Sequence, residues 1–133
     1  MAGERNLDVL IASMEPVVRD GRYVFVTVDT ATAATLPAEI VVRETEGVTV
    51  VVAQAEADAR GLPYDFVAGW ITLQVHSALD AVGLTAAFSG ALAASGISTN
   101  VVAGYHHDHL LVPINDVDRA MAALRELAAG RDV

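Results

Sequence analysis

The sequence predicts an α+β fold in which helices cover one face of an antiparallel sheet. Strand patterns and helix patterns occur in groups along the chain, without the strict alternation that produces a parallel sheet. The order helix, turn, strand in residues 7–26 recurs in residues 84–102, and the order strand, helix in 48–62 recurs in 109–124. With 133 residues, 53% of them hydrophobic, the chain can build the core of one domain or of two small units.

The first half shows each element of the pattern once. Leu7, Leu10, Ile11 and Met14 recur at helical spacing after Asn6, a suitable N-cap. We expect a turn at residues 20–21, a strand at 22–28, a loop at 30–37, a hairpin formed by residues 39–44 and 48–53, and a short helix at 54–60.

The second half is patterned more clearly. Residues 70–77 alternate, so Ile71, Leu73 and Val75 share one face of a predicted strand. An apolar stripe predicts a helix from Leu84 to Ser95. Further expected elements are strands at 97–104 and 109–113 and a helix at 117–127.

Composition excludes several classes of function. The formal net charge is −9 and all eight cationic residues are arginines, which argues against binding to nucleic-acid phosphates. Without lysine or cysteine the chain has no Schiff-base lysine, thiolate nucleophile or cysteine-ligated zinc. The first residues do not read as a signal peptide, and no apolar run reaches about 18 residues. We therefore expect no membrane association and a cytoplasmic location.

The stretch "VHSALDAVGLTAAFSGALAASGISTNVVAG" resembles the ACT domain, a βαββαβ module with a ferredoxin-like fold. The longer pattern "GLTAA…ISTNVVAGYHHDH" is similar to small stand-alone tandem ACT proteins and to the regulatory ACT pair of aspartate kinases. The resemblance implies two tandem units, an N-terminal one at 1–65 and a C-terminal one at 66–133. Both look incomplete, so strand 70–77 serves both units, or strands are exchanged between the halves or between subunits.

The resemblance implies a ligand loop at the start of the helix that begins at Leu84. A free amino acid needs N–H donors for its carboxylate, and the first turn of a helix offers them. Gly83 would let a ligand approach the backbone, and Asp80 and Asn100 would accept hydrogen bonds from the ammonium group. The expected ligand-binding residues are Asp80, Ala81, Val82, Gly83, Leu84, Thr85, Asn100 and Val101. Taken alone, Gly83 and Asp80 also fit a tight turn with a solvated acid.

Three histidines, His106, His107 and His109, form a second candidate site. In an extended chain they would face opposite sides, while zinc usually takes at least three protein ligands. We expect a polar turn, and a metal site only if the chain bends or if His76 or a second subunit contributes a ligand.

Together these features predict a non-catalytic regulatory protein that binds a small molecule, expected to be an amino acid, without a cofactor. We expect it to act as a homodimer or a tetramer of dimers, because incomplete units leave sheet edges to cover. The alternatives are a metal-dependent enzyme that uses the histidine turn, and a structural partner subunit.

Overall fold

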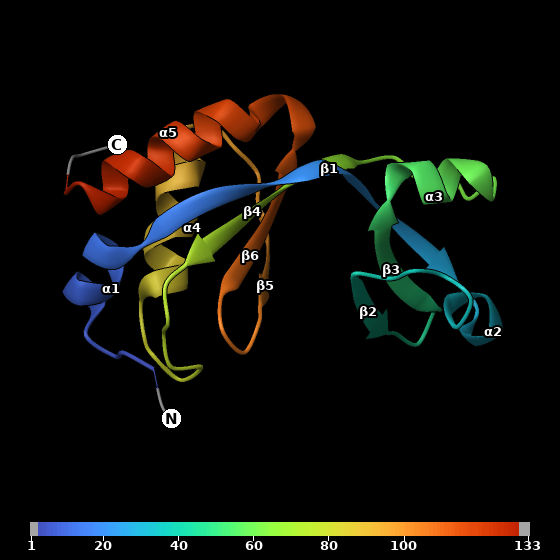
Figure 1. Ribbon diagram of the computed structural model, residues 1–133, viewed down its shortest axis with the longest axis horizontal. Helices are drawn as coiled ribbons and strands as arrows, with labels where there is room; N and C mark the ends of the chain where they lie inside the picture. Colours follow the sequence, from blue (N-terminus) through green and yellow to red (C-terminus); the bar gives the residue numbers. More distant parts are fainter. Residues whose placement is uncertain (1–2, 131–133) are drawn as a thin grey trace. The chain divides into compact units, whose positions relative to one another are not determined.

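The computed structural model describes residues 3–130. Figure 1 shows its helices and strands. The predicted helices and strands all occur among them, in the predicted order along the chain. In chain order, the elements of the structure are α1 (Leu7–Ser13), β1 (Glu15–Val28), α2 (Thr30–Ala33), β2 (Ile40–Arg43), β3 (Val48–Ala53), α3 (Gln54–Ala59), β4 (Val67–Gln74), α4 (Leu84–Ala94), β5 (Asn100–Ala103), β6 (Asp108–Pro113), the 3-10 turn Ile114–Asp116, and α5 (Val117–Ala128).

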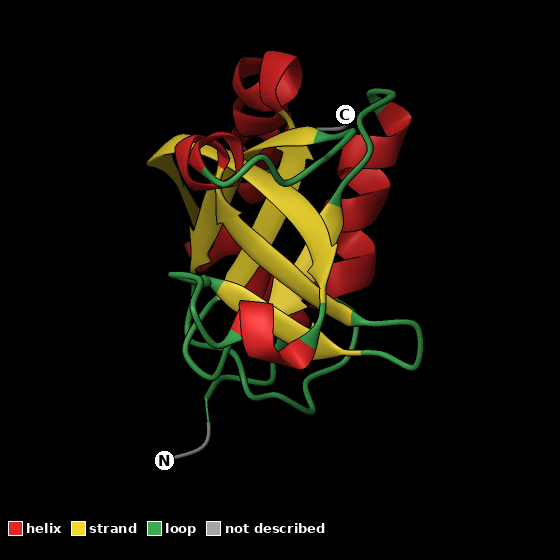
Figure 2. Ribbon diagram, turned by 90° about the vertical axis from the view of Figure 1, so that its right-hand side faces the viewer, coloured by secondary structure: helices red, strands yellow, loops and turns green. Residues whose placement is uncertain are grey.

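The strands follow the hydrogen-bonded order β2-β3-β1-β4-β6-β5. Strand β3 pairs antiparallel with both β1 and β2, and β5 pairs antiparallel with β6. Figure 2 separates these strands, in yellow, from the helices, in red. The predicted α+β class with antiparallel pairing and ferredoxin-like units is confirmed.

The chain forms two compact units, and one of them is built from two separate segments. Among the described residues, unit 1 comprises 3–20 and 69–130, and unit 2 comprises 21–68. Strands β1 and β4 both cross the boundary between the units. Unit 1 therefore has the strand order β1-β4-β6-β5, in which the N-terminal part of β1 supplies the fourth strand that the C-terminal sequence lacks. The expected division of the sequence into an N-terminal unit at 1–65 and a C-terminal unit at 66–133 stays a prediction.

The core of unit 1 lies between its sheet and helices α1, α4 and α5. Ile71 and Leu73 of β4 and Val75, just after the end of that strand, are all buried there, together with Phe88 and Leu92 of α4. Unit 2 has its own smaller core, in which valines of β1 and β3 pack against Leu36 and Ala57. Each unit thus buries an apolar cluster of its own.

Two local predictions in the first half are wrong. The turn expected at residues 20–21 is absent, because β1 continues through it and Gly21 absorbs the distortion with a φ of +104°. Part of the loop expected at 30–37 is the short helix α2, which Asp29 caps by accepting a hydrogen bond of 2.7 Å from the Thr32 N–H. The Asn6 cap of α1 is confirmed by a bond of 3.1 Å from the Val9 N–H to Asn6 Oδ1.

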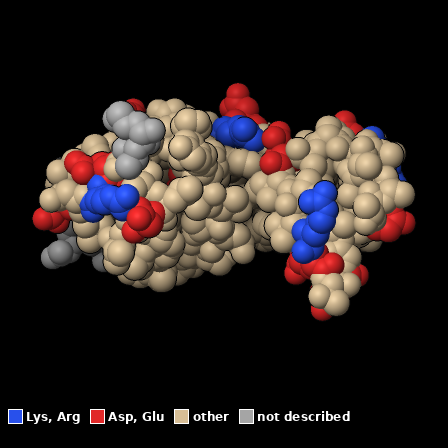
Figure 3. Space-filling model, turned by 90° about the horizontal axis from the view of Figure 1, so that it is seen from below, with Lys and Arg blue, Asp and Glu red and all other residues tan. Residues whose placement is uncertain are grey.

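The arginines are dispersed on the face drawn in Figure 3, where each blue patch lies beside acidic side chains. No helix within residues 3–130 has both the length and the apolar character required to cross a bilayer.

Candidate functional site

Helix α4 begins at a glycine, which has no side chain that could accept a hydrogen bond from the first turn. Gly83 is the N-cap residue, has a φ of +102°, and accepts the first helical hydrogen bond from the Ala87 N–H at 2.9 Å. No side chain caps this end of the helix. The amide hydrogens of the first turn have no acceptor within the helix, so this terminus attracts a negatively charged group.

The side of Gly83 where a Cβ would stand is filled by the protein itself. A Cβ built there would lie 3.0 Å from Cδ2 of Leu7, a residue of α1. The space that glycine provides at this point is therefore used for packing against α1, and a ligand would reach the first turn from another side.

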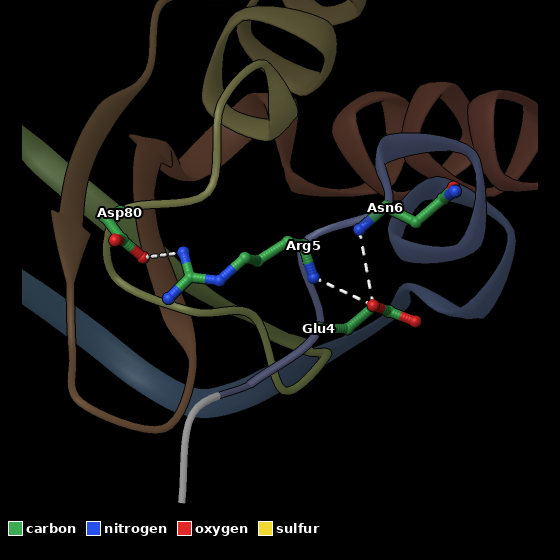
Figure 4. Close-up of polar contacts among 4 residues, drawn as sticks. All are labelled: Glu4, Arg5, Asn6 and Asp80. Atoms are coloured by element: carbon green, nitrogen blue, oxygen red, sulfur yellow. Dashed lines mark hydrogen bonds and ion pairs between the residues drawn. The ribbon is translucent and has the colours of Figure 1, made fainter.

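The loop before Gly83 is held by the N-terminal segment of the chain. The Glu4 N–H donates to the His76 carbonyl at 2.9 Å, and the Ala78 N–H donates to the Glu4 carbonyl at 3.1 Å. The Arg5 guanidinium forms an ion pair with the Asp80 carboxylate, as Figure 4 shows. Both of these side chains are largely exposed, so the pair adds little stability but orients the loop.

Two hollows share the segment Ser77–Leu79 in their lining. The larger, which we call the Arg5 hollow, has a volume of about 130 Å³ and lies between Arg5, His76, Asp80 and Tyr105. The smaller, which we call the α4 hollow, has a volume of about 60 Å³; besides Ser77–Leu79, its lining residues are Ala81, Leu84, Thr85, Ala103, Gly104 and Asp108.

The predicted site residues divide between these places. Ala81, Leu84 and Thr85 line the α4 hollow, Asp80 lines the Arg5 hollow, and Val82 is exposed at the surface. Gly83, the N-cap of α4, is not among the lining residues of either hollow.

Asn100 and Val101 are separated from this group. The hollow reaches β5 at Ala103, while Asn100 begins the strand three residues earlier, about 10 Å away at 3.3 Å per residue. Asn100 is exposed and Val101 packs against the core of unit 1. The ammonium contact expected from Asn100 therefore cannot form in the α4 hollow.

Sequence reasoning missed Asp108, which is only 9% exposed and lines the α4 hollow. Burial raises the pKa of its carboxyl group, and the neighbouring His109 and His107 partly oppose that effect. The signal that was available is the alternation along β6. Asp108 precedes the buried Leu110 and Val112 by two and four residues, which places it on their face of the sheet.

The histidine turn separates its three rings. His109 lies against Trp70 and Thr72, where its Nδ1 is 3.2 Å from the Trp70 indole nitrogen and 3.1 Å from the Thr72 hydroxyl. The Trp70 N–H donates to Nδ1, which requires that this nitrogen carry no proton. Burial lowers the pKa of His109, and the Arg19 charge lowers it further.

His106 lies instead beside Tyr105, at 5.1 Å between ring centroids, and 6.3 Å from both His76 and His107. Within residues 3–130, no three side chains of His, Cys, Asp or Glu are placed so that they could hold a metal ion.

Two family models identify the class of protein. Residues 2–69 match one ACT domain model and residues 65–126 match a second. The chain belongs to the ACT domain family and contains two ACT domains in tandem. ACT domains are typically regulatory modules that bind small molecules. No curated protein sequence matches the chain.

Several solved structures share the fold. A Vibrio cholerae protein of unknown function, described as a possible transport protein, is 44% identical with a TM-score of 0.84, over 92% of this chain and 95% of that one. The aspartate kinase of Clostridium acetobutylicum matches 96% of this chain with 36% of its own, at 10% identity and a TM-score of 0.69. The ligand-free regulatory subunit of aspartate kinase from Thermus thermophilus is 8% identical with a TM-score of 0.63, over 86% of this chain and 98% of that one.

Proposed function

We propose that this protein is a non-catalytic regulatory sensor that binds an amino acid at the start of helix α4. One observation carries the proposal: α4 begins at Gly83 without a side-chain cap, and its first turn borders the α4 hollow. Free amide hydrogens beside a small cavity suit a carboxylate, which is the group that all amino acids share. Membership in a family of small-molecule-binding modules supports the same reading.

In this proposal each part of the loop has a separate task. The backbone of Leu84 and Thr85 binds the ligand carboxylate, and Ala81 and Leu84 form the apolar wall. The ion pair of Asp80 with Arg5 keeps the loop in position and fixes the side of the hollow formed by Ser77–Leu79.

A thermal-shift screen of the twenty standard amino acids tests the function. A ligand present at 100 times its dissociation constant stabilises a protein by about 2.7 kcal/mol. We therefore expect a clear rise of the melting temperature with at least one amino acid. If no amino acid shifts the melting temperature at millimolar concentration, the proposed function is wrong.

We also propose that the protein is a homodimer or a tetramer of dimers. Strand β2 stands at one end of the strand order, and its Val41 and Val42 are 46% and 48% exposed. An apolar edge strand of this kind is a surface that proteins usually cover. Sedimentation velocity at micromolar concentration should give a mass of at least two chains, and Val42→Lys should shift it toward one. A monomeric wild-type protein would contradict this proposal.

A further inference from the structure

The α4 hollow contains a buried negative charge. Asp108 is the one charged side chain among residues 3–130 that is more than nine-tenths buried, and it lines the hollow together with Leu84 and Thr85 of the first turn of α4. It begins β6 on the same face as Leu110 and Val112, which belong to the core of unit 1. The carboxylate is therefore on the side of the sheet that carries the helices.

No side chain or backbone N–H in the described part of the chain donates a hydrogen bond to this carboxylate. Its electrostatic neighbours are the two histidines beside it, His107 and His109, and the indole N–H of Trp70 donates to Nδ1 of His109. Arg5, the cation near the adjoining Arg5 hollow, is already paired with Asp80. Among the described residues, the fully enclosed side-chain atoms without a partner are Thr99 Oγ1 and His107 Nδ1, so the Asp108 oxygens are not sealed off and can accept a hydrogen bond from a donor bound in the hollow.

We propose that Asp108 binds the ammonium group of the ligand and thereby selects amino acids over simple carboxylic acids. This inference rests on the proposed function, because it presumes that the carboxylate of the ligand lies on the first turn of α4. The two ends of a zwitterion then meet complementary partners in one cavity. The uncapped amide hydrogens of α4 face the carboxylate and Asp108 faces the ammonium.

The remaining lining restricts the ligand further. Ala78, Ala81, Leu84 and Ala103 contribute apolar surface, and Asp108 is the one charged residue that lines the hollow. Its volume of about 60 Å³ is small for a ligand cavity. These properties fit the head group of an amino acid with a small, uncharged side chain.

Isothermal titration calorimetry with matched pairs of probes tests the inference. The probes are glycine with acetate, and L-alanine with propanoate, because each pair differs by one amino group. The wild-type protein should bind the amino acids and not the acids. Asp108→Asn removes the charge with almost no change in volume, and should weaken amino-acid binding by about 10-fold to 150-fold, as expected for a lost charge-assisted hydrogen bond.

Asp65→Asn is the matched control, because it removes an exposed carboxylate of unit 2 that does not line the α4 hollow. It should change affinity by less than about threefold. The melting temperature of each free variant is recorded first. Asp108→Asn should melt no lower than the wild type, because it removes an uncompensated buried charge. Should the asparagine variant fail to fold, Asp108→Ser provides the same comparison.

The outcomes separate this inference from the proposed function. If the amino acids bind Asp108→Asn as tightly as the wild type, the assignment of Asp108 is wrong while the proposed function stands. If acetate binds as tightly as glycine, the selection for an ammonium group is likewise wrong. If only amino acids with large or charged side chains bind, the inference that the ligand has a small, uncharged side chain is wrong. If none of the twenty amino acids binds, the proposed function itself fails and this inference fails with it.

Discussion

Replacing Phe88 with alanine is expected to lower the free energy of unfolding by about 3–5 kcal/mol. Phe88 is completely buried in the core of unit 1 and is the largest of the fully buried side chains. Its loss removes apolar contacts and leaves a cavity between α4 and the sheet, which the surrounding strands cannot fill without shifting.

Urea unfolding followed by tryptophan fluorescence measures this effect. Trp70 is the single tryptophan of the chain and lies in unit 1 with Phe88, so its signal reports on the unit that carries the substitution. Ser89→Ala, the neighbouring position on the same helix, is the control and should change stability by less than about 0.5 kcal/mol. A cost below about 1 kcal/mol for Phe88→Ala would mean that α4 is not packed as described.

Replacing Gly83 with valine is expected to destabilise the protein and also to abolish ligand binding. The φ of +102° costs a β-branched residue about 1–3 kcal/mol, and the new Cβ also meets Leu7 at 3.0 Å. The Leu7 methyl group can move, so the backbone conformation is the larger part of the cost. Binding is lost because the first turn of α4 no longer presents its amide hydrogens in place.

Gly90 offers a matched control within the same helix. It lies in the interior of α4, and a Cβ placed there would meet no atom within 4 Å. Gly90→Ala should therefore stabilise the protein by about 0.5–1 kcal/mol, and Gly83→Ala should destabilise it. Equal effects of the two substitutions in urea unfolding would show that Gly83 is an ordinary helical glycine. Unchanged amino-acid affinity in Gly83→Val would place the ligand site elsewhere.

The second half of the chain could be predicted from sequence more fully than the first. The alternation of residues 70–77 and the apolar stripe from Leu84 gave β4 and α4 with the correct buried faces, because local periodicity decides both. The passage of β1 through Gly21 could not be predicted in this way. A strand that serves two units depends on partners far away in the sequence, and local turn signals argue against it.

In the candidate site, too, local sequence signals predicted some residues and not those that depend on distant parts of the chain. Gly83 and Thr85 were proposed from the sequence because a helix start has a local signature. Asn100 was expected near them because it begins the next strand, but α4 is 11 residues long and carries the chain about 16 Å away before that strand starts. Asp108 and Arg5 were missed because each reaches the site from a distant part of the chain. Asp108 comes through the β5–β6 hairpin and Arg5 through the bridge between Glu4 and Ser77.

The central claim is that an amino acid binds at the first turn of α4, and backbone amide chemical shifts test it most directly. The ¹⁵N-labelled protein is titrated with the amino acid that gives the largest rise in melting temperature, and the shift of every amide is followed. We predict that the largest changes occur at residues 84–86, at the first turn of α4, and at residues 103–108, around Asp108. Saturable changes confined to residues 21–68, with residues 84–86 unmoved, would contradict the account.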